Sequence, residues 1–294
     1  MRPWGIIFLF VAIGSVPMSR AIAADYLELV DFHLIDGTGD AERSVRRLVA
    51  RDGVIVCIDA QGTEPVPEPT ASWTRIGLDG AWLMPGLIDT HVHVARFPRA
   101  REMAERILVR AVCGGIPGVR DLGGDARALA EIERASANGE LIVPHLDFSA
   151  MFGGPDIFRQ GPTTELAIGN RPGEAFWAHA VTGGTDLQRL VAEAHGSGTT
   201  NAKIYGDLTP TLATQLIRET RSQGMQTTAH ATVSSARPSD LVEAGVGSLA
   251  HAPYLVWEAV DTVPADYRKR TEGPWNEIPA DHPRLMALYR CMGE

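Results

Sequence analysis

From residue 85 onward, short apolar segments alternate with segments of helical pattern, and this alternation constrains the fold more than any other feature of the sequence. Parallel strands need long crossover connections, so the alternation predicts a parallel sheet covered by helices, either open or closed as a barrel. Six strand-plus-connection units are present, with strands expected at 85–94, 118–121, 141–146, 202–205, 225–230 and 246–251. Helices are expected at 99–112, 126–137, 187–195, 209–224, 238–244 and 282–292, the last with Asp281 as its N-cap. A Gly/Pro-rich loop is expected at 152–173.

Residues 24–84, which precede this alternation, are predicted as a small N-terminal β module. Turns are expected at Asp36–Gly39 and Asp52–Gly53, between segments that alternate or are apolar throughout. A loop with three prolines spans 63–72 and leads to a strand pair around 73–76 and 81–84. Residues 85–294 form the second predicted domain, the parallel α/β unit.

Residues 1–23 have the pattern of a signal peptide. Arg2 is followed by an apolar core from Ile6 to Ile13, and the small residues Ala21 and Ala23 favour cleavage after Ala23. The apolar core is shorter than the roughly 20 residues that span a bilayer, which disfavours the alternative of an uncleaved membrane anchor. We therefore expect an exported protein, periplasmic or secreted, without a stable membrane anchor.

Charge and cysteine content exclude several classes of protein. The formal net charge is -9, and an acidic chain without a basic stripe is not expected to bind nucleic acid. Cys57, Cys113 and Cys291 are odd in number and far apart, so they predict neither a disulfide framework nor a cysteine metal site. The oligomeric state is left open by the sequence, and an oligomer is compatible with it.

The segment from Leu83 to Val94 carries the first candidate site. In a strand, Asp89, His91 and His93 share one face, where two imidazoles can bind one divalent ion such as zinc. Asp89 is a candidate to hold the second ring nitrogen of a ligand histidine. The alternative, a chance His-x-His spacing, is disfavoured because these polar side chains end a strongly apolar strand.

Three further candidates belong to later strands. Lys203 is one of only two lysines and lies inside a predicted parallel strand, where burial favours the neutral amine. His230 and His251 end two other strands, at the edge where barrel enzymes place catalytic residues. The alternatives are a solvated lysine at a strand end and satisfied core histidines. The other five histidines are interpreted as structural or solvated, with His145 as the candidate exception.

In this order, the motifs resemble those of the amidohydrolase superfamily, and most of all its branch of imidazolonepropionase-like proteins and prolidase-type dipeptidases. The resemblance covers nearly the whole chain after residue 23. It rests on Pro85–His93, Gly118–Asp121, Lys203–Tyr205, His230 and His251, and on Asp36–Gly39 and Arg51–Ile55 in the β module.

This resemblance implies a (β/α)8 TIM-barrel with a divalent metal centre, one or two ions and most simply zinc, at the carboxyl ends of the strands. It implies that His91 and His93 bind one ion, that His230 and His251 bind the other, and that Lys203, carbamylated by carbon dioxide, bridges them. Lys203 and His230 are the expected catalytic residues. Tyr205 and Tyr254 are candidates for substrate contact, although barrel packing explains them as well.

The sequence departs from the family pattern near its end. The family supplies a further aspartate at the end of the eighth strand, whereas no acidic residue after His251 ends an apolar strand here. We therefore expect about six of the eight units, a C-terminally incomplete barrel, and a chain that is inactive by itself.

The expected reaction is hydrolysis of a carbon–nitrogen bond in a small-molecule substrate by a metal-activated water. The substrate would be a non-peptide amide, a cyclic amide or a dipeptide. Two alternatives stay open: an inactive relic or metal-binding scaffold, and a hydrolase that resembles lactonases or phosphotriesterases.

Overall fold

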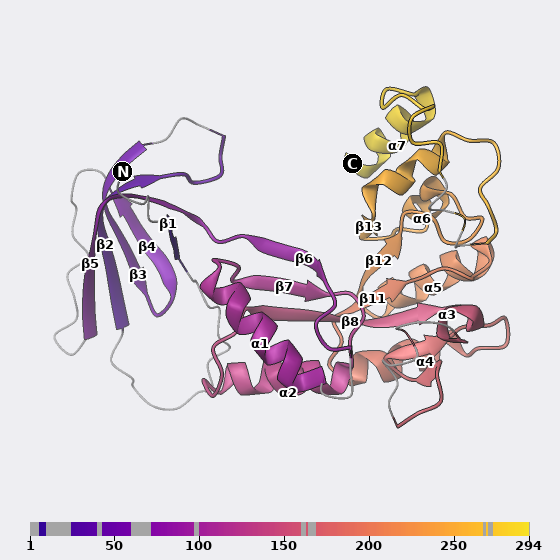
Figure 1. Cartoon of the computed structure of the whole chain (residues 1–294), viewed down its shortest axis with the longest axis horizontal. Helices are drawn as coiled ribbons and strands as arrows, with labels where there is room; N and C mark the ends of the chain where they lie inside the picture. The colour runs from indigo at the N-terminus through magenta and orange to yellow at the C-terminus, as the bar shows by residue number, and fades with distance from the viewer. Residues whose placement is uncertain are drawn as a thin grey trace. The chain divides into compact units, whose positions relative to one another are not determined.

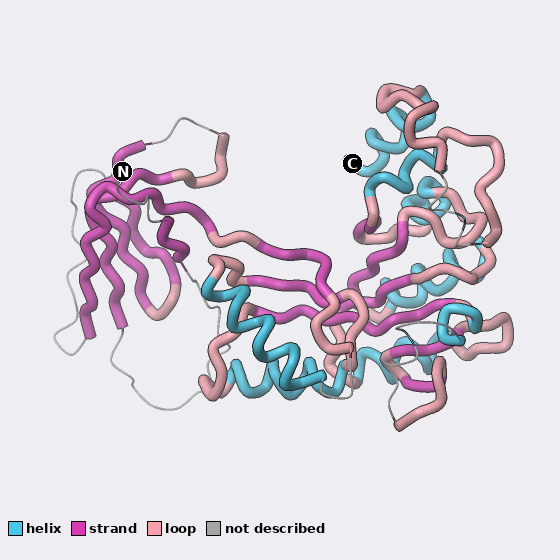
Figure 2. The backbone as a smooth tube through the Cα atoms, in the orientation of Figure 1, coloured by secondary structure: helices cyan, strands magenta, loops and turns pink. Residues whose placement is uncertain are grey.

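The computed structural model describes residues 6–9, 25–39, 43–59, 72–96, 100–159, 163, 169–266, 269 and 273–293. The chain divides into two compact units. The first comprises Met1–Ile88, Val109–Gly118 and Ser136–His145, and the second comprises Asp89–Leu108, Val119–Ala135 and Leu146–Glu294. Figure 2 shows that strands dominate the beginning of the chain, whereas helices and strands alternate further along.

The first unit is built on a five-stranded sheet with the order β1-β5-β2-β3-β4 (Figure 1). β2 pairs antiparallel with β3, as β3 does with β4, whereas β1 and β2 lie parallel to β5. Leu29, Leu48 and Leu83 are buried in its core. The strands are β1 (Ile6–Leu9), β2 (Asp25–Leu34), β3 (Arg43–Arg51), β4 (Val54–Asp59) and β5 (Ser72–Pro85).

The strand pair predicted on either side of Asp79-Gly80 is wrong, because both halves belong to the single strand β5. Asp79 and Gly80 have the positive φ angles of a turn, 47° and 77°. However, residues on both sides pair with the same neighbour, β2, which has a register shift of its own between Val30 and Phe32. The two positive φ angles therefore accommodate a bulge instead of a hairpin.

Part of the predicted signal peptide is described: Ile6–Leu9 forms β1 and pairs with residues 82–85 of β5. The cleavage site after Ala23 and most of the proline-containing loop at 63–72 lie outside the described residues. Across the described part of the chain, no helix has both the length and the apolar character needed to cross a membrane.

Six parallel strands carry the rest of the chain, in the order β6-β7-β8-β11-β12-β13 (Figure 1). Two short strands extend the edge of β8, β10 running parallel to it and β9 antiparallel to β10. The predicted mixed α/β fold with six strand units is confirmed, whereas eight units stay a prediction. The strands are β6 (Ile88–Val92), β7 (Gly118–Asp121), β8 (His145–Gly153), β9 (Glu174–Ala175), β10 (Ala178–Ala180), β11 (Asn201–Ile204), β12 (Gln226–His230) and β13 (Ser248–Ala250).

Helices cover the outer face of these strands. Ala202 and Ile204 of β11 and Ala229 of β12 pack with apolar side chains of α4, α5 and α6 in one buried cluster. Since successive residues of a strand point to opposite faces, Lys203 and His230 point to the inner face. The helices are α1 (Ala100–Cys113), α2 (Ala126–Ala137), α3 (Pro155–Arg159), α4 (Leu187–Gly196), α5 (Pro210–Ser222), α6 (Pro238–Glu243), the 3-10 helix η2 (Ala252–Glu258) and α7 (Pro283–Gly293).

Three local predictions are wrong. The strand expected at 141–146 lies at 145–153 instead, and Ile142 of the misleading apolar run is 78% exposed. The expected loop at 152–173 contains the end of β8 and α3. Finally, His282 and not Asp281 precedes α7, and its Nδ1 accepts a hydrogen bond from the backbone N–H of Arg284 at 3.3 Å.

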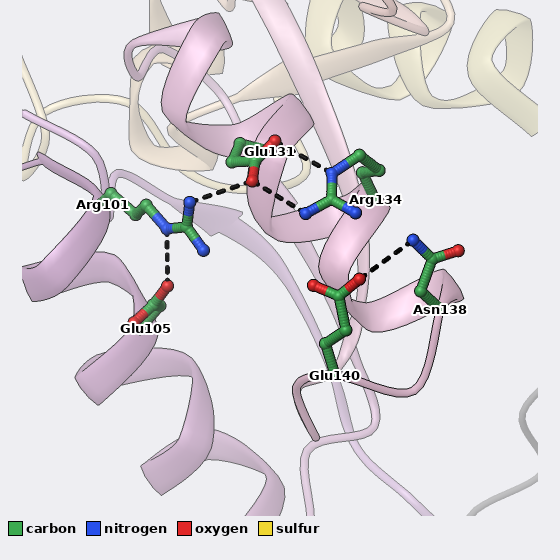
Figure 3. A network of polar contacts seen from close by, with 6 residues as sticks. All are labelled: Arg101, Glu105, Glu131, Arg134, Asn138 and Glu140. Atoms are coloured by element: carbon green, nitrogen blue, oxygen red, sulfur yellow. Dashed lines mark hydrogen bonds and ion pairs between the residues drawn. The ribbon is translucent and has the colours of Figure 1, made fainter.

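In the second unit, α1 and α2 are joined by a network of charged side chains (Figure 3). Arg101 of α1 donates to Glu105 at 2.8 Å and to Glu131 of α2 at 3.0 Å, and Arg134 donates twice to Glu131. Hydrogen bonding from Arg134, and then from Arg101, lowers the pKa of Glu131 to about 2. These side chains are solvated, so the network orients the two helices more than it stabilises the protein.

Candidate functional site

The predicted metal ligands lie at or near the carboxyl ends of the parallel strands. His91 lies in β6 with His93 just beyond it, Lys203 lies in β11, His230 is the last residue of β12, and His251 directly follows β13. Tyr205 follows β11, and Tyr254 lies in η2. All seven belong to the second compact unit.

These side chains form one cluster. Ring centroids are separated by 5.1 Å between His91 and His93, by 5.0 Å between His91 and His251, and by 4.8 Å between His230 and His251. Tyr205 lies 4.4 Å from His230, and Lys203 Nζ is 5.8 Å from the centroid of Tyr205. The structure therefore brings together residues that are up to 160 positions apart in the sequence.

The contact between His91 and His251 also shows how the sheet is curved. β6 and β13 are the first and last strands of the six-strand path. In a flat sheet of this order their backbones would be about 24 Å apart, at about 4.8 Å for each step between strands. A ring separation of 5.0 Å instead requires a sheet curled into a nearly closed barrel at this end.

His91 and His93 have the geometry of two ligands of one metal ion. Their Nε2 atoms are 3.3 Å apart. Two nitrogens that bind a tetrahedral zinc at about 2.0–2.1 Å are themselves about 3.3–3.4 Å apart. The distance between the two Nε2 atoms therefore matches that between two ligands of one zinc ion.

A backbone carbonyl, and not a carboxylate, lies beside the second ring nitrogen of His93. His93 Nδ1 lies 3.3 Å from the carbonyl oxygen of Gly123, and a proton on Nδ1 would leave the lone pair on Nε2. Asp89, predicted to hold a ring nitrogen, accepts a hydrogen bond from the backbone N–H of His91 at 3.1 Å. A backbone carbonyl from the loop after β7 thus orients His93, in the role that the sequence analysis assigned to Asp89.

Both histidines are held in the neutral form that metal binding requires. Burial lowers the pKa of His93 to about 4, with a further contribution from the positive charge of Arg96. The pKa of His91 is also lowered, chiefly by burial. The two rings therefore offer nitrogen lone pairs at neutral pH.

Lys203 is fully buried, with 0% of its surface exposed, so the alternative of a solvated lysine is wrong. It pairs in register with Met151 of β8 and Thr228 of β12, at the centre of the parallel sheet. A buried ammonium is costly, and the neutral amine is the form that reacts with carbon dioxide.

The full set of metal ligands is not assembled. Within the ranges that the structure describes, no group of three or more His, Cys, Asp or Glu side chains is arranged to hold a metal ion. The chemistry of the donors and the His91–His93 distance fit a metal, but the four-histidine arrangement implied by the family resemblance stays a prediction. The three cysteines are unpaired, as expected, and do not join the cluster.

Sequence reasoning missed Asp121, the last residue of β7. It is fully buried, and its carboxylate accepts hydrogen bonds from the backbone N–H groups of Val94 at 2.7 Å and Gly123 at 2.9 Å. Burial raises its pKa to about 6, although these hydrogen bonds favour the charged form. Asp121 thus holds the segment that carries His93 and also the loop whose Gly123 carbonyl contacts the His93 ring. Its place at the end of a strand, like that of His230, was the available signal.

Asp121→Ala is expected to lower the free energy of unfolding by about 2–4 kcal/mol, because two buried N–H groups lose their acceptor. Asp121→Asn should cost less, since the amide oxygen still accepts a hydrogen bond. Urea denaturation measures both, with the exposed Asp281→Ala as control. Equal midpoints for Asp121→Ala and the control would show that these hydrogen bonds do not hold the loops.

His251 has an unusual backbone conformation, with φ 66° and ψ 64°. This left-handed geometry turns the chain sharply from β13 into η2. Arg237 secures the far end of η2, donating to the carbonyl oxygens of Val260 and Asp261, each at 2.6 Å. Arg237 therefore holds the segment that follows η2.

The remaining histidines lie apart from these contacts, as the sequence analysis expected. His145, the candidate exception, is exposed at the start of β8, and His33 stacks on Trp82 at 4.9 Å in the first unit. His179 is partly buried in β10, and burial lowers its pKa.

No family model and no curated protein matches the sequence. Solved structures do match. A Xaa-Pro dipeptidase with bound methionine superposes with a TM-score of 0.62 at 18% identity, over 79% of this chain and 62% of that one. A. niger ochratoxinase gives 0.62 at 21% identity, over 79% and 61%, and an amidohydrolase gives 0.58 at 19% identity, over 78% and 61%.

The chain spans about three fifths of the length of these structures. Identities this low establish a common fold and leave activity open. The comparisons therefore show that this chain shares its fold with these structures.

Proposed function

We propose that this protein is a metal-dependent hydrolase of carbon–nitrogen bonds in small molecules. The observation that carries the proposal is the 3.3 Å separation of His91 Nε2 and His93 Nε2, inside a cluster of four histidine rings at the strand ends. The names of the structural neighbours, among them a dipeptidase and an amidohydrolase, support the same class of reaction.

In this proposal His91 and His93 hold one divalent ion, most simply zinc, and His230 and His251 hold a second. Metal bound there would polarise the scissile carbonyl and make a water nucleophilic near neutral pH. The neutral state of His91 and His93 keeps their nitrogens available as ligands. Tyr205, whose ring lies 4.4 Å from that of His230, would contact the substrate.

Lys203 would bridge the two ions as a carbamate. Its neutral amine would attack carbon dioxide, forming one N–C bond and releasing one proton, and the product carries two oxygens at the centre of the sheet. Burial of Lys203 supports this role because metal ions nearby would balance the carbamate charge. Export to a periplasm or secretion is proposed with it, from the pattern of residues 1–23.

The test is a zinc-supplemented screen for hydrolysis of dipeptides, N-acyl amino acids and lactones. It uses the chain extended by the C-terminal segment of a structural neighbour, because the chain is expected to be inactive by itself. Cleavage of an amide that is abolished by a chelator and restored by zinc is the expected result. Cleavage of lactones alone would show that the protein hydrolyses esters and not carbon–nitrogen bonds. Absence of hydrolysis in a chain shown to bind zinc would favour the metal-binding scaffold.

A further inference from the structure

An aromatic pair extends outward from the histidine cluster. The ring of Tyr254 lies 5.6 Å from that of His251, and the ring of Trp275 lies 5.5 Å from that of Tyr254, at an interplanar angle of 34°. The three rings form a row that begins at the cluster. Trp275 belongs to a segment far from every motif discussed above, and nothing in the proposed chemistry requires it.

The outer ring of this row is accessible to solvent. Trp275 leaves 37% of its surface exposed, whereas Trp257, packed with Val256 and Val263, leaves 6%. Tyr254 is partly buried against that same apolar cluster. The apolar cluster therefore holds the Tyr254 ring, and the partly exposed Trp275 ring lies beside it.

The backbone holds Trp275 in this position. The N–H of Trp275 donates to the carbonyl of Gly273 at 2.8 Å, which closes a tight turn around Pro274. The indole folds back over Gly273, so that a Cβ atom there would lie 2.7 Å from Cη2 and Cζ2 of the ring. Glycine at 273 is thus required for the observed place of the ring.

We propose that Tyr254 and Trp275 form a subsite for an aryl group of the substrate, an inference that rests on the proposed hydrolase function. Aromatic rings attract one another in offset and edge-on arrangements, with centroids about 4.5–7 Å apart. The spacing of the row matches this range, and the exposed part of the Trp275 side chain offers aromatic surface to one more ring. A substrate whose scissile bond lies at the histidines would reach this subsite with an aryl side chain.

Binding without turnover tests the subsite directly. We would titrate the zinc-loaded chain with N-acetylphenylalanine and with N-acetylalanine, and follow each ligand by saturation-transfer NMR. The wild-type chain should bind the phenyl ligand about tenfold more tightly. Trp275→Ala should remove this preference, and Trp275→Phe should restore most of it, whereas binding of N-acetylalanine should change little in either variant.

A glycine pair supplies the matched control. Gly273→Ala should displace the indole and weaken the phenyl preference, while Gly183→Ala, where a Cβ would meet nothing within 4 Å, should leave it intact. Equal binding of the two ligands by the wild-type chain, or a full preference in Trp275→Ala, would overturn the subsite. A Trp275-dependent preference without any amide hydrolysis would support the subsite and count against the hydrolase function.

Discussion

His91→Ala and His93→Ala should each lose one of two bound divalent ions. The intact site is expected to hold two ions per chain, and each variant removes one of the two nitrogens that lie 3.3 Å apart. Loss of a partner in the outer shell of a metal site typically lowers metal affinity about 10–100-fold, and loss of a direct ligand should exceed that range. Hydrolytic activity, where detected, should fall with the metal content.

Elemental analysis after dialysis against zinc measures this stoichiometry. His145→Ala is the matched control, because His145 is exposed and lies outside the cluster. Wild-type protein that retains no metal after folding with zinc would contradict the metal centre. Equal metal content in His93→Ala and His145→Ala would contradict the role of His93.

Lys203→Ala should abolish most of the activity and eliminate a carbamate signal. Wild-type chain incubated with ¹³C-bicarbonate should give a carbamate carbon resonance by NMR, because a buried neutral amine adds carbon dioxide readily. Short carboxylates should partly restore activity to Lys203→Ala by filling the vacated position. Lys203→Arg should not be restored, since a guanidinium stays protonated and forms no carbamate.

Two variants serve as controls for this experiment, one for misfolding and one for labelling of other amines. Lys203→Met keeps the length of the side chain and should fold without the resonance. Lys269→Ala removes the other lysine, which is exposed, and should keep the resonance. An active Lys203→Arg chain, or a resonance that persists in Lys203→Met, would show that Lys203 carries no carbamate.

Local pattern was sufficient to predict much of the fold. Strand β7 and helix α2 lie where they were expected, at 118–121 and 126–137, because alternating or helical apolar spacing there agrees with the packing. The prediction of strands failed where the local sequence pattern indicates one structure and the packing of the folded chain favours another. The apolar run at Ile142 resembles a strand but lies exposed, and the two strands expected around 73–76 and 81–84 form one strand because both pair with β2.

For the site, the sequence by itself determined which side chains end the strands, and hence that His91, Lys203, His230 and His251 meet at one edge. Two rules are sufficient for this prediction: successive side chains of a strand point to opposite faces, and parallel strands all end at the same edge of the sheet. Only the tertiary structure decided how far the sheet curls, which brings His91 and His251 to a ring separation of 5.0 Å. It also decided the contacts of Asp121, Gly123 and Trp275, because no local pattern specifies the partners of a buried carboxylate, a backbone carbonyl or an indole ring.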